Sequence, residues 1–203
     1  MNIALIGATG NVGSRILEEA LRRGHQVIAI ARDAGKIAAR DKLTARSADV
    51  KDTAALATAI AGADVVVSSG RFANFTAADV LPALKQAGVK RLAVVGGAGS
   101  LEIAPGKALV DTPDFPAEYK PEATAGRAFL NDLRGEKDIA WTFLSPSALF
   151  IAGERTGKFR LGADQLLADA AGKSWISYED YAIALLDELE QPKHLRARFT
   201  VGY

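Results

Sequence analysis

The segment Gly7-Ala8-Thr9-Gly10-Asn11-Val12-Gly13 decides the fold class of this chain. It follows the apolar run 3–6 and precedes the stretch 12–21, whose apolar side chains recur at helical spacing until Gly24 closes it. Glycines between a strand and a helix allow a tight turn, close approach of a pyrophosphate and close helix packing, while free amides at the helix start face the phosphates. A tight turn without a ligand is the alternative. The predicted phosphate contacts are Gly7, Thr9, Gly10, Asn11, Val12 and Gly13.

Short apolar runs alternate with amphipathic segments over the first 145 residues. The runs are rich in Val, Ile and Ala, as in strands that a parallel sheet buries on both faces. They lie at 3–6, 27–31, 65–67, 92–95 and 141–144, with a weaker one at 43–48. The expected helices lie at 12–21, 53–61, 77–87 and 122–133, and Asp52 is the expected N-cap of the second. This alternation predicts a doubly wound, parallel, Rossmann-like α/β sheet in three layers.

The length of 203 residues suits one domain. We expect a nucleotide-binding core in residues 1–145 and a small substrate-side tail with a lid in residues 146–203. The tail contains a strand-like segment at 158–161, a helix at 178–190 with Ser177 as N-cap, and a last strand at 198–201.

Residues 96–118 hold several glycines and prolines but few periodic apolar positions. The sequence predicts here a long loop that is functional or mobile. Either residues 99–118 or the turn 153–157 could cover a substrate.

Composition excludes several classes of function. Cysteine is absent and only two histidines occur, so no disulfide and no metal site is predicted; His25 and His194 are expected outside the crevice. The net charge is +1 without a basic run, and no 18-residue apolar segment occurs, so neither nucleic acid nor membrane is an expected partner. The first residues enter a strand pattern without a basic leader, which favours the cytoplasm. A monomer or a homodimer is compatible with the sequence.

The spacing of the glycine turn, Gly-x-x-Gly-x-x-Gly in a strand–turn–helix context, resembles the short-chain dehydrogenase/reductase superfamily. The chain is most similar to the atypical branch of NAD(P)H-binding proteins, the NmrA-like and biliverdin reductase B (flavin reductase-like) family. The local match is best over residues 2–36. The resemblance implies a Rossmann-like fold and a nicotinamide cofactor.

The end of the strand 27–31 indicates which nicotinamide cofactor is bound. Arg32 follows the strand and Lys36 lies one turn further on, whereas NAD enzymes usually have a carboxylate here for the ribose hydroxyl. Two cations can clamp a 2′-phosphate, which favours NADP(H) over NAD(H). Asp33 is a competing ribose contact, and surface charge without a ligand is the alternative for both cations.

Further cofactor contacts are expected where the other strands end. The resemblance implies that Asp49 and Val50 lie at the adenine and that a turn at a proline borders the nicotinamide. Strand ends opening on the crevice add candidates near the cofactor ribose, with ordinary turn residues as the alternative. These candidates are Ser68, Ser69, Gly70, Gly96, Ser145 and Pro146.

The Tyr-x-x-x-Lys pair of classical superfamily members is absent, because no tyrosine has a lysine four residues later. Two catalytic candidates are left. Ser100 could orient a substrate carbonyl, and Tyr119 could supply a proton or stack on a flat substrate. A solvated loop serine and a surface tyrosine are the alternatives.

Because the pair is missing, flat and electron-poor acceptors suit this sequence better than secondary alcohols. The sequence predicts an NADPH-dependent oxidoreductase that transfers hydride to a planar acceptor such as a flavin or quinone, whose proton can come from water. The alternative is a non-catalytic redox sensor that binds NADP(H). A nucleotide-sugar epimerase is disfavoured, since it needs the tyrosine and a larger C-terminal domain.

Overall fold

The structure, a computed structural model, describes residues 1–203. Its strands are β1 (Asn2–Ile6), β2 (Gln26–Ala31), β3 (Leu43–Ser47), β4 (Val65–Ser68), β5 (Arg91–Val95), β6 (Glu102–Ala104), β7 (Lys107–Ala108), β8 (Ala140–Pro146), β9 (Leu149–Ile151), β10 (Arg160–Gly162), β11 (Trp175–Ser177) and β12 (Ala197–Gly202). Its α-helices are α1 (Asn11–Arg22), α2 (Thr53–Ile60), α3 (Ala77–Ala87), α4 (Lys120–Gly135) and α5 (Tyr178–Glu190). Short 3₁₀ turns lie at η1 (Ala34–Lys36), η2 (Ala98–Ser100), η3 (Leu109–Asp111) and η4 (Ala117–Tyr119).

Eight strands form one sheet in the order β10-β12-β8-β5-β4-β1-β2-β3. All neighbours are parallel except β10, which runs antiparallel to β12 at the edge. The order reverses at β1, which pairs with β2 on one side and with β4 on the other. The predicted doubly wound sheet is confirmed, and its carboxyl ends at the reversal form the crevice where such sheets bind ligands.

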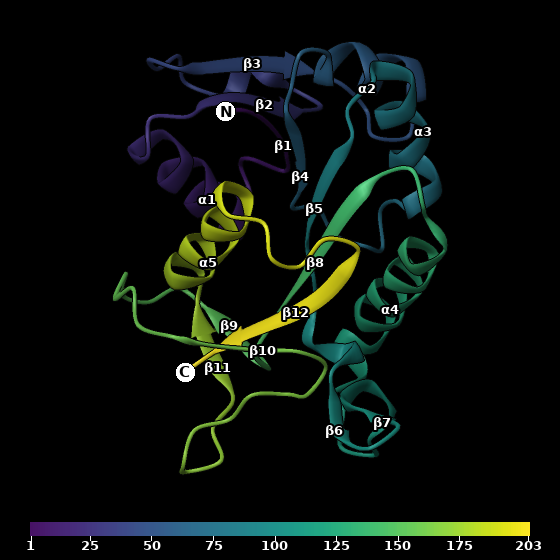
Figure 1. The fold of residues 1–203 in the computed structure, drawn as a ribbon, viewed down its shortest axis with the longest axis vertical. Coiled ribbons are helices and arrows are strands. Elements are labelled where there is room, and N and C mark those ends of the chain that lie inside the picture. The colour runs from purple at the N-terminus through teal and green to yellow at the C-terminus, as the bar shows by residue number, and fades with distance from the viewer.

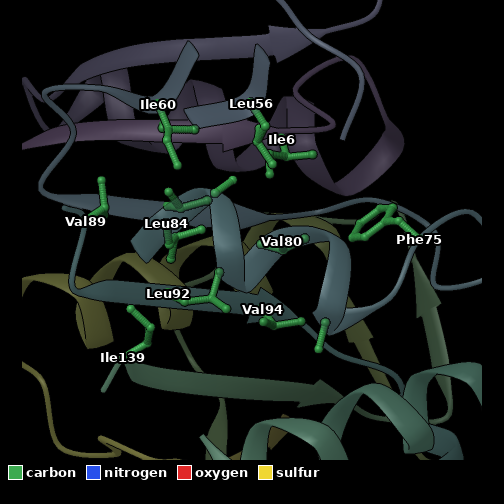
Figure 2. Packing of buried hydrophobic residues seen from close by; sticks show 14 of the residues in the cluster. Ile6, Leu56, Ile60, Phe75, Val80, Leu84, Val89, Leu92, Val94 and Ile139 are labelled. Atoms are coloured by element: carbon green, nitrogen blue, oxygen red, sulfur yellow. The ribbon is translucent and has the colours of Figure 1, made fainter. Parts of the chain in front are cut away.

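Helices cover both faces of this sheet (Figure 1). Helices α1 and α5 pack on one face, and α2, α3 and α4 pack on the other. Successive residues of a strand serve opposite cores: Ile6 and Val66 belong to the α2–α4 side, whereas Leu5 and Val67 belong to the α1–α5 side. Figure 2 shows the first of these cores, where side chains of α2 and α3 meet those of the sheet. Burial on both faces explains the uninterrupted apolar runs in the sequence.

Helix starts follow the side-chain caps. Asp52 accepts a hydrogen bond from the Ala55 amide at 2.9 Å at the start of α2, and Ser177 accepts one from the Asp180 amide at 3.0 Å at the start of α5. Both predicted N-caps are confirmed. Such caps satisfy amides that the helix itself leaves unpaired, and each is worth about 1 kcal/mol.

Short elements depart from the prediction. The expected long loop at 96–118 contains the β6–β7 hairpin and three 3₁₀ turns, and its side chains Leu101 and Val110 are fully buried. Helix α4 is longer than expected because Pro121 is well placed in a first helical turn. The tail strand β10 lies two residues later than predicted. Strands β9 and β11, which pair in parallel, were not predicted, since three residues carry too little periodicity.

Residues 146–203 complete the same sheet and core as the rest of the chain. Strand β12 lies beside β8, and α5 packs along α1. Tyr181 of α5 is fully buried and donates a hydrogen bond of 2.6 Å to the Leu144 carbonyl, while burial raises the pKa of its phenol. The tail therefore packs as part of the sheet rather than as a separate layer. None of the helices combines the length and the apolar character that crossing a membrane requires.

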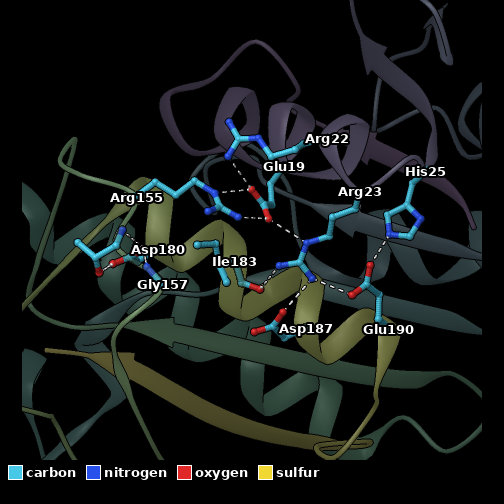
Figure 3. A network of polar contacts seen from close by, with 11 residues as sticks. Glu19, Arg22, Arg23, His25, Arg155, Gly157, Asp180, Ile183, Asp187 and Glu190 are labelled. Carbon is cyan, nitrogen blue, oxygen red and sulfur yellow. Dashed lines mark hydrogen bonds and ion pairs between the residues drawn. The ribbon is translucent and has the colours of Figure 1, made fainter.

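A network of charged groups fastens the tail segment around Arg155 onto α1 (Figure 3). Glu19 of α1 is buried and accepts two hydrogen bonds of 2.9 Å from the Arg155 guanidinium and one of 2.9 Å from Arg23. Burial works to raise the pKa of Glu19, but the hydrogen bonds from Arg155 and Arg23 outweigh it and lower the pKa from 4.5 to about 2. Glu19 therefore stays ionised from neutral down to mildly acidic pH.

Replacing Glu19 should make the free energy of unfolding less dependent on pH in the acidic range. A carboxyl with a lowered folded-state pKa stabilises the fold above its unfolded pKa, and this contribution disappears as the pH falls toward the folded value. Glu19→Gln should lower the free energy of unfolding by about 3 kcal/mol at pH 6, since one pKa unit corresponds to roughly 1.4 kcal/mol. The difference from wild type should shrink steadily between about pH 5 and pH 2.

Urea denaturation of both proteins across this pH range measures the effect. Glu118→Gln is the matched control, because Glu118 is exposed and forms no ion pair. A difference between wild type and Glu19→Gln that stays constant with pH would contradict the assignment.

Candidate functional site

The turn between β1 and α1 depends on two glycines. Gly7 has φ +81°, and a Cβ there would lie 2.6 Å from the Ser69 carbonyl oxygen. A Cβ at Gly13 would lie 2.0 Å from the Gly7 carbonyl oxygen, so α1 packs directly on the turn. At Gly10 the same oxygen would be 3.3 Å away, which is much less restrictive. The three glycines therefore have different tasks, as the sequence motif implies.

Backbone amides of this turn are free. The N–H groups of Thr9, Asn11, Val12 and Gly13 donate no hydrogen bond, and the N-cap residue Gly10 has no side chain to cap the helix. Side chains cap helices α2, α3 and α5, whereas α1 and α4 have no side-chain cap. Converging free amides at a helix start, together with the positive end of its dipole, suit an anion such as a phosphate.

Arg32 stands alone at the carboxyl end of β2. Its side chain is exposed and forms no hydrogen bond or ion pair. Asp33, the competing ribose contact, accepts a hydrogen bond from the Gly35 amide at 3.2 Å and lies 3.4 Å from the Lys36 ammonium. Arg32 is thus the cation available to a ligand phosphate, whereas Lys36 is exposed but already shares its charge with a neighbouring carboxylate.

Other predicted cofactor residues lie around the same edge. Asp49 is exposed beyond β3 and accepts a hydrogen bond of 2.9 Å from the Lys51 amide, and Val50 is half-buried beside it. Ser68 is buried at the end of β4, while Ser69 and Gly70 are half-buried, and the Ser69 backbone passes beside the glycine turn. The structure therefore brings the ends of β1, β2, β3 and β4 together at one edge.

A cavity of about 650 Å³ continues this edge beyond the carboxyl ends of β5 and β8. Its apolar wall is aromatic to an unusual degree. The aromatic lining residues are Phe72, Phe115, Tyr119 and Phe150. Residues 69–72 run from the glycine turn into this wall, so the two parts of the site are continuous. A second cavity, of about 370 Å³ beside α5 and β10, contains none of the predicted site residues.

Glu122 of α4 holds one wall of the cavity in place. Its carboxylate accepts hydrogen bonds from the amides of Phe72 at 2.7 Å and Ala73 at 2.9 Å. The Phe72 ring stacks on Phe143 with 5.9 Å between centroids, and a Cβ at Gly126 would approach that ring to 2.9 Å. This wall is a fixed, flat surface.

Four of the predicted site residues line the cavity itself: Gly96, Ser100, Tyr119 and Pro146. Ser100 is half-buried, and its hydroxyl oxygen accepts a hydrogen bond of 3.4 Å from Arg198. Tyr119 is 63% exposed and stands at the rim. The Ser145 hydroxyl is buried without a hydrogen-bond partner, and Ser145 does not line the cavity, although Pro146 after it does.

The lid alternatives separate in the structure. Residues of the 99–118 segment, among them Leu109, Thr112 and Phe115, line the cavity. The turn 153–157 does not, because the amides of Thr156 and Gly157 donate to Asp180 at 2.8 Å and fasten the turn onto α5. Of the two lid alternatives, only the segment 99–118 therefore lines the cavity.

Sequence reasoning missed several lining residues. Phe72 follows the fourth strand by four residues, a position that could have been flagged with the crevice, but Phe150 lies on the unpredicted strand β9. Arg198, which contacts Ser100 from behind the cavity and does not line it, was predicted only as part of the last strand. The histidines were placed correctly: His25 pairs with Glu190 and His194 with Glu188, each at 2.8 Å and outside the crevice.

The profile of an NAD(P)H-binding family matches residues 7–192. The chain belongs to this NAD(P)H-binding family. It is 45% identical to the YwnB protein of Bacillus subtilis, with 99% of this chain and 98% of that protein covered. Among solved structures, it is 44% identical to a candidate epimerase of Bacteroides thetaiotaomicron (TM-score 0.92; 100% and 96% covered). It is 37% identical to a candidate NADH-flavin reductase of Streptococcus pneumoniae (TM-score 0.87; 100% and 99% covered).

Substituting the glycines of the turn should separate packing from ligand approach. Gly13→Ala forces a Cβ against the Gly7 carbonyl, so it should lower the free energy of unfolding by about 1–3 kcal/mol and weaken NADPH binding. Gly10→Ala, with 3.3 Å of space, is the matched control and should keep most of the stability. Urea denaturation and NADPH fluorescence titration measure both effects. Equal stability of the two variants would contradict the packing role of Gly13.

Proposed function

We propose that this protein is an NADPH-dependent oxidoreductase that transfers hydride to a planar acceptor such as a flavin or quinone. The observation that carries the proposal is the aromatic cavity that continues from the glycine turn along residues 69–72. A bound nicotinamide would supply the hydride, and the exposed or half-buried rings of Phe115, Tyr119 and Phe150 would give a flat acceptor surfaces to stack on. The Tyr-x-x-x-Lys pair needed for secondary alcohols is absent.

The proposed cofactor contacts follow the strand ends. The free amides of residues 9–13 would hold the pyrophosphate, and Arg32 with Lys36 would face the 2′-phosphate. Asp49 and Val50 would border the adenine. The contacts proposed for the ribose and nicotinamide half are Ser68, Ser69, Gly70, Gly96, Ser145 and Pro146.

This chain's own residues would mainly orient the acceptor. Ser100 would hydrogen-bond a polar atom of the acceptor, and Tyr119 at the rim would stack on it or deliver a proton. Flavins and quinones take their proton from water, so no buried acid is required. The name of the Streptococcus pneumoniae relative supports a flavin as acceptor. The name of the Bacteroides thetaiotaomicron relative favours epimerase chemistry, which the missing tyrosine–lysine pair disfavours here.

Purified protein mixed with NADPH and a panel of flavins and quinones should oxidise NADPH well above the uncatalysed rate. Absorbance at about 340 nm, where reduced nicotinamides absorb, follows the reaction. An acceptor concentration of roughly 0.1 mM is suitable, because KM values commonly fall below about 1 mM. Gly13→Ala serves as a cofactor-site control. Tight binding of NADPH without turnover of any acceptor would refute the reductase and favour the redox sensor.

Charge reversal at Arg32 should change the cofactor preference. Arg32→Glu removes a cation from the 2′-phosphate and should weaken NADPH binding about tenfold or more, while NADH binding changes little. Lys137→Glu, the same charge change at the opposite end of the sheet, should leave both affinities unchanged. Fluorescence titration with each cofactor measures this. An unchanged ratio of the two affinities in Arg32→Glu would overturn the NADP preference.

A further inference from the structure

A buried arginine of the tail lies directly behind Ser100. Arg198 projects from β12, and its side chain is only 4% exposed. It donates to the Asp164 carboxylate through both Nε and Nη2, and through Nη1 to the Ser100 hydroxyl oxygen at 3.4 Å. Ser100 itself faces the cavity. One guanidinium therefore connects a carboxylate outside the cavity with a hydroxyl inside it.

The direction of this hydrogen bond is fixed by chemistry. A guanidinium has five donors and no acceptor, and it stays protonated in proteins. Ser100 must therefore accept from Arg198, which leaves its own hydroxyl hydrogen for another partner. No protein group accepts that hydrogen, and the cavity lies in front of it. The positive charge behind the oxygen also makes the hydroxyl a stronger donor.

The tail segment that carries Asp164 is itself held in place by backbone hydrogen bonds to Glu102. The Asp164 carbonyl accepts from the Glu102 amide at 2.8 Å, and the Leu166 amide donates back to the Glu102 carbonyl at 2.8 Å. Asp164 is therefore a fixed counter-charge for Arg198. Because a buried cation without a counter-charge is costly, Asp164 is what allows a charged arginine to lie behind a cavity serine.

We propose that Arg198 is a positioning residue that aims the Ser100 hydroxyl, as a hydrogen-bond donor, at a carbonyl oxygen or unprotonated ring nitrogen of the acceptor. This inference rests on the proposed function and narrows it to acceptors with such an atom conjugated to the reduced centre. The acceptor gains hydride as the C–H bond of the reduced nicotinamide breaks. The negative charge then spreads to the atom that Ser100 contacts, and a proton from water neutralises it, leaving the oxidised nicotinamide and the two-electron-reduced acceptor.

A double-mutant cycle tests whether Arg198 acts through the Ser100 hydroxyl. Ser100→Ala and Arg198→Met should each lower kcat/KM for a benzoquinone and for FMN about tenfold, the worth of one hydrogen bond. The double variant should be no slower than Ser100→Ala, since Arg198 acts through that hydroxyl. Arg198→Lys keeps a cation there and should recover most of the activity. NADPH affinity should be the same in all four variants.

Arg160→Met is the matched control, because Arg160 fastens the tail through the carbonyls of Ala168 and Tyr203 but does not line the cavity. It should keep the wild-type rate. Losses that multiply in the double variant, or no recovery with lysine in a protein of unchanged melting temperature, would reduce Arg198 to a structural clamp. Wild-type protein that turns over neither acceptor would instead overturn the proposed function, and this inference with it.

Discussion

The carbonyl oxygen of Gly7 faces the first turn of α1 so closely that residue 13 has no room for a side chain. This contact lets α1 start directly on the end of β1 and leaves its first amides unpaired. The same edge of the parallel sheet carries the ends of β2, β4, β5 and β8. The free amides and the aromatic wall of the site are both positioned relative to this close contact between the Gly7 carbonyl and α1.

The tail completes the site by fastening onto the first helix. Glu19 and Asp180 are buried carboxylates that accept hydrogen bonds from the segment around Arg155, so this segment is fixed on the α1–α5 side of the sheet. Strand β12 from the same tail carries Arg198 to the back of Ser100. Residues 146–150 of the tail thus line part of the cavity. A buried carboxylate is costly unless it is paired, and Arg23 and Arg155 both pair with Glu19.

Because the Tyr-x-x-x-Lys pair is absent, the proposed reaction depends on the orientation of the acceptor rather than on proton transfer by a side chain. The cavity offers aromatic surfaces and the Ser100 hydroxyl, and its lining also includes the ionisable side chains Arg71, Asp114, Tyr119, Glu122 and Arg127. Under the proposed function, such a site suits acceptors that exchange protons with water and need alignment with a bound nicotinamide. Family membership agrees with a cofactor of this type.

Local patterns in the sequence determined the strands buried on both faces, the glycine turn, and the caps Asp52 and Ser177, because each depends on neighbours a few residues away. The short strands β9 and β11 depend instead on pairing between residues about 26 positions apart, so no local periodicity in the sequence predicts them. Likewise, Arg198 meets Ser100 across 98 positions. The sequence by itself determined the glycine turn and the sheet edge that carries it, while only the tertiary structure decided which side chains line the cavity, since those contacts arise when distant strands are brought side by side.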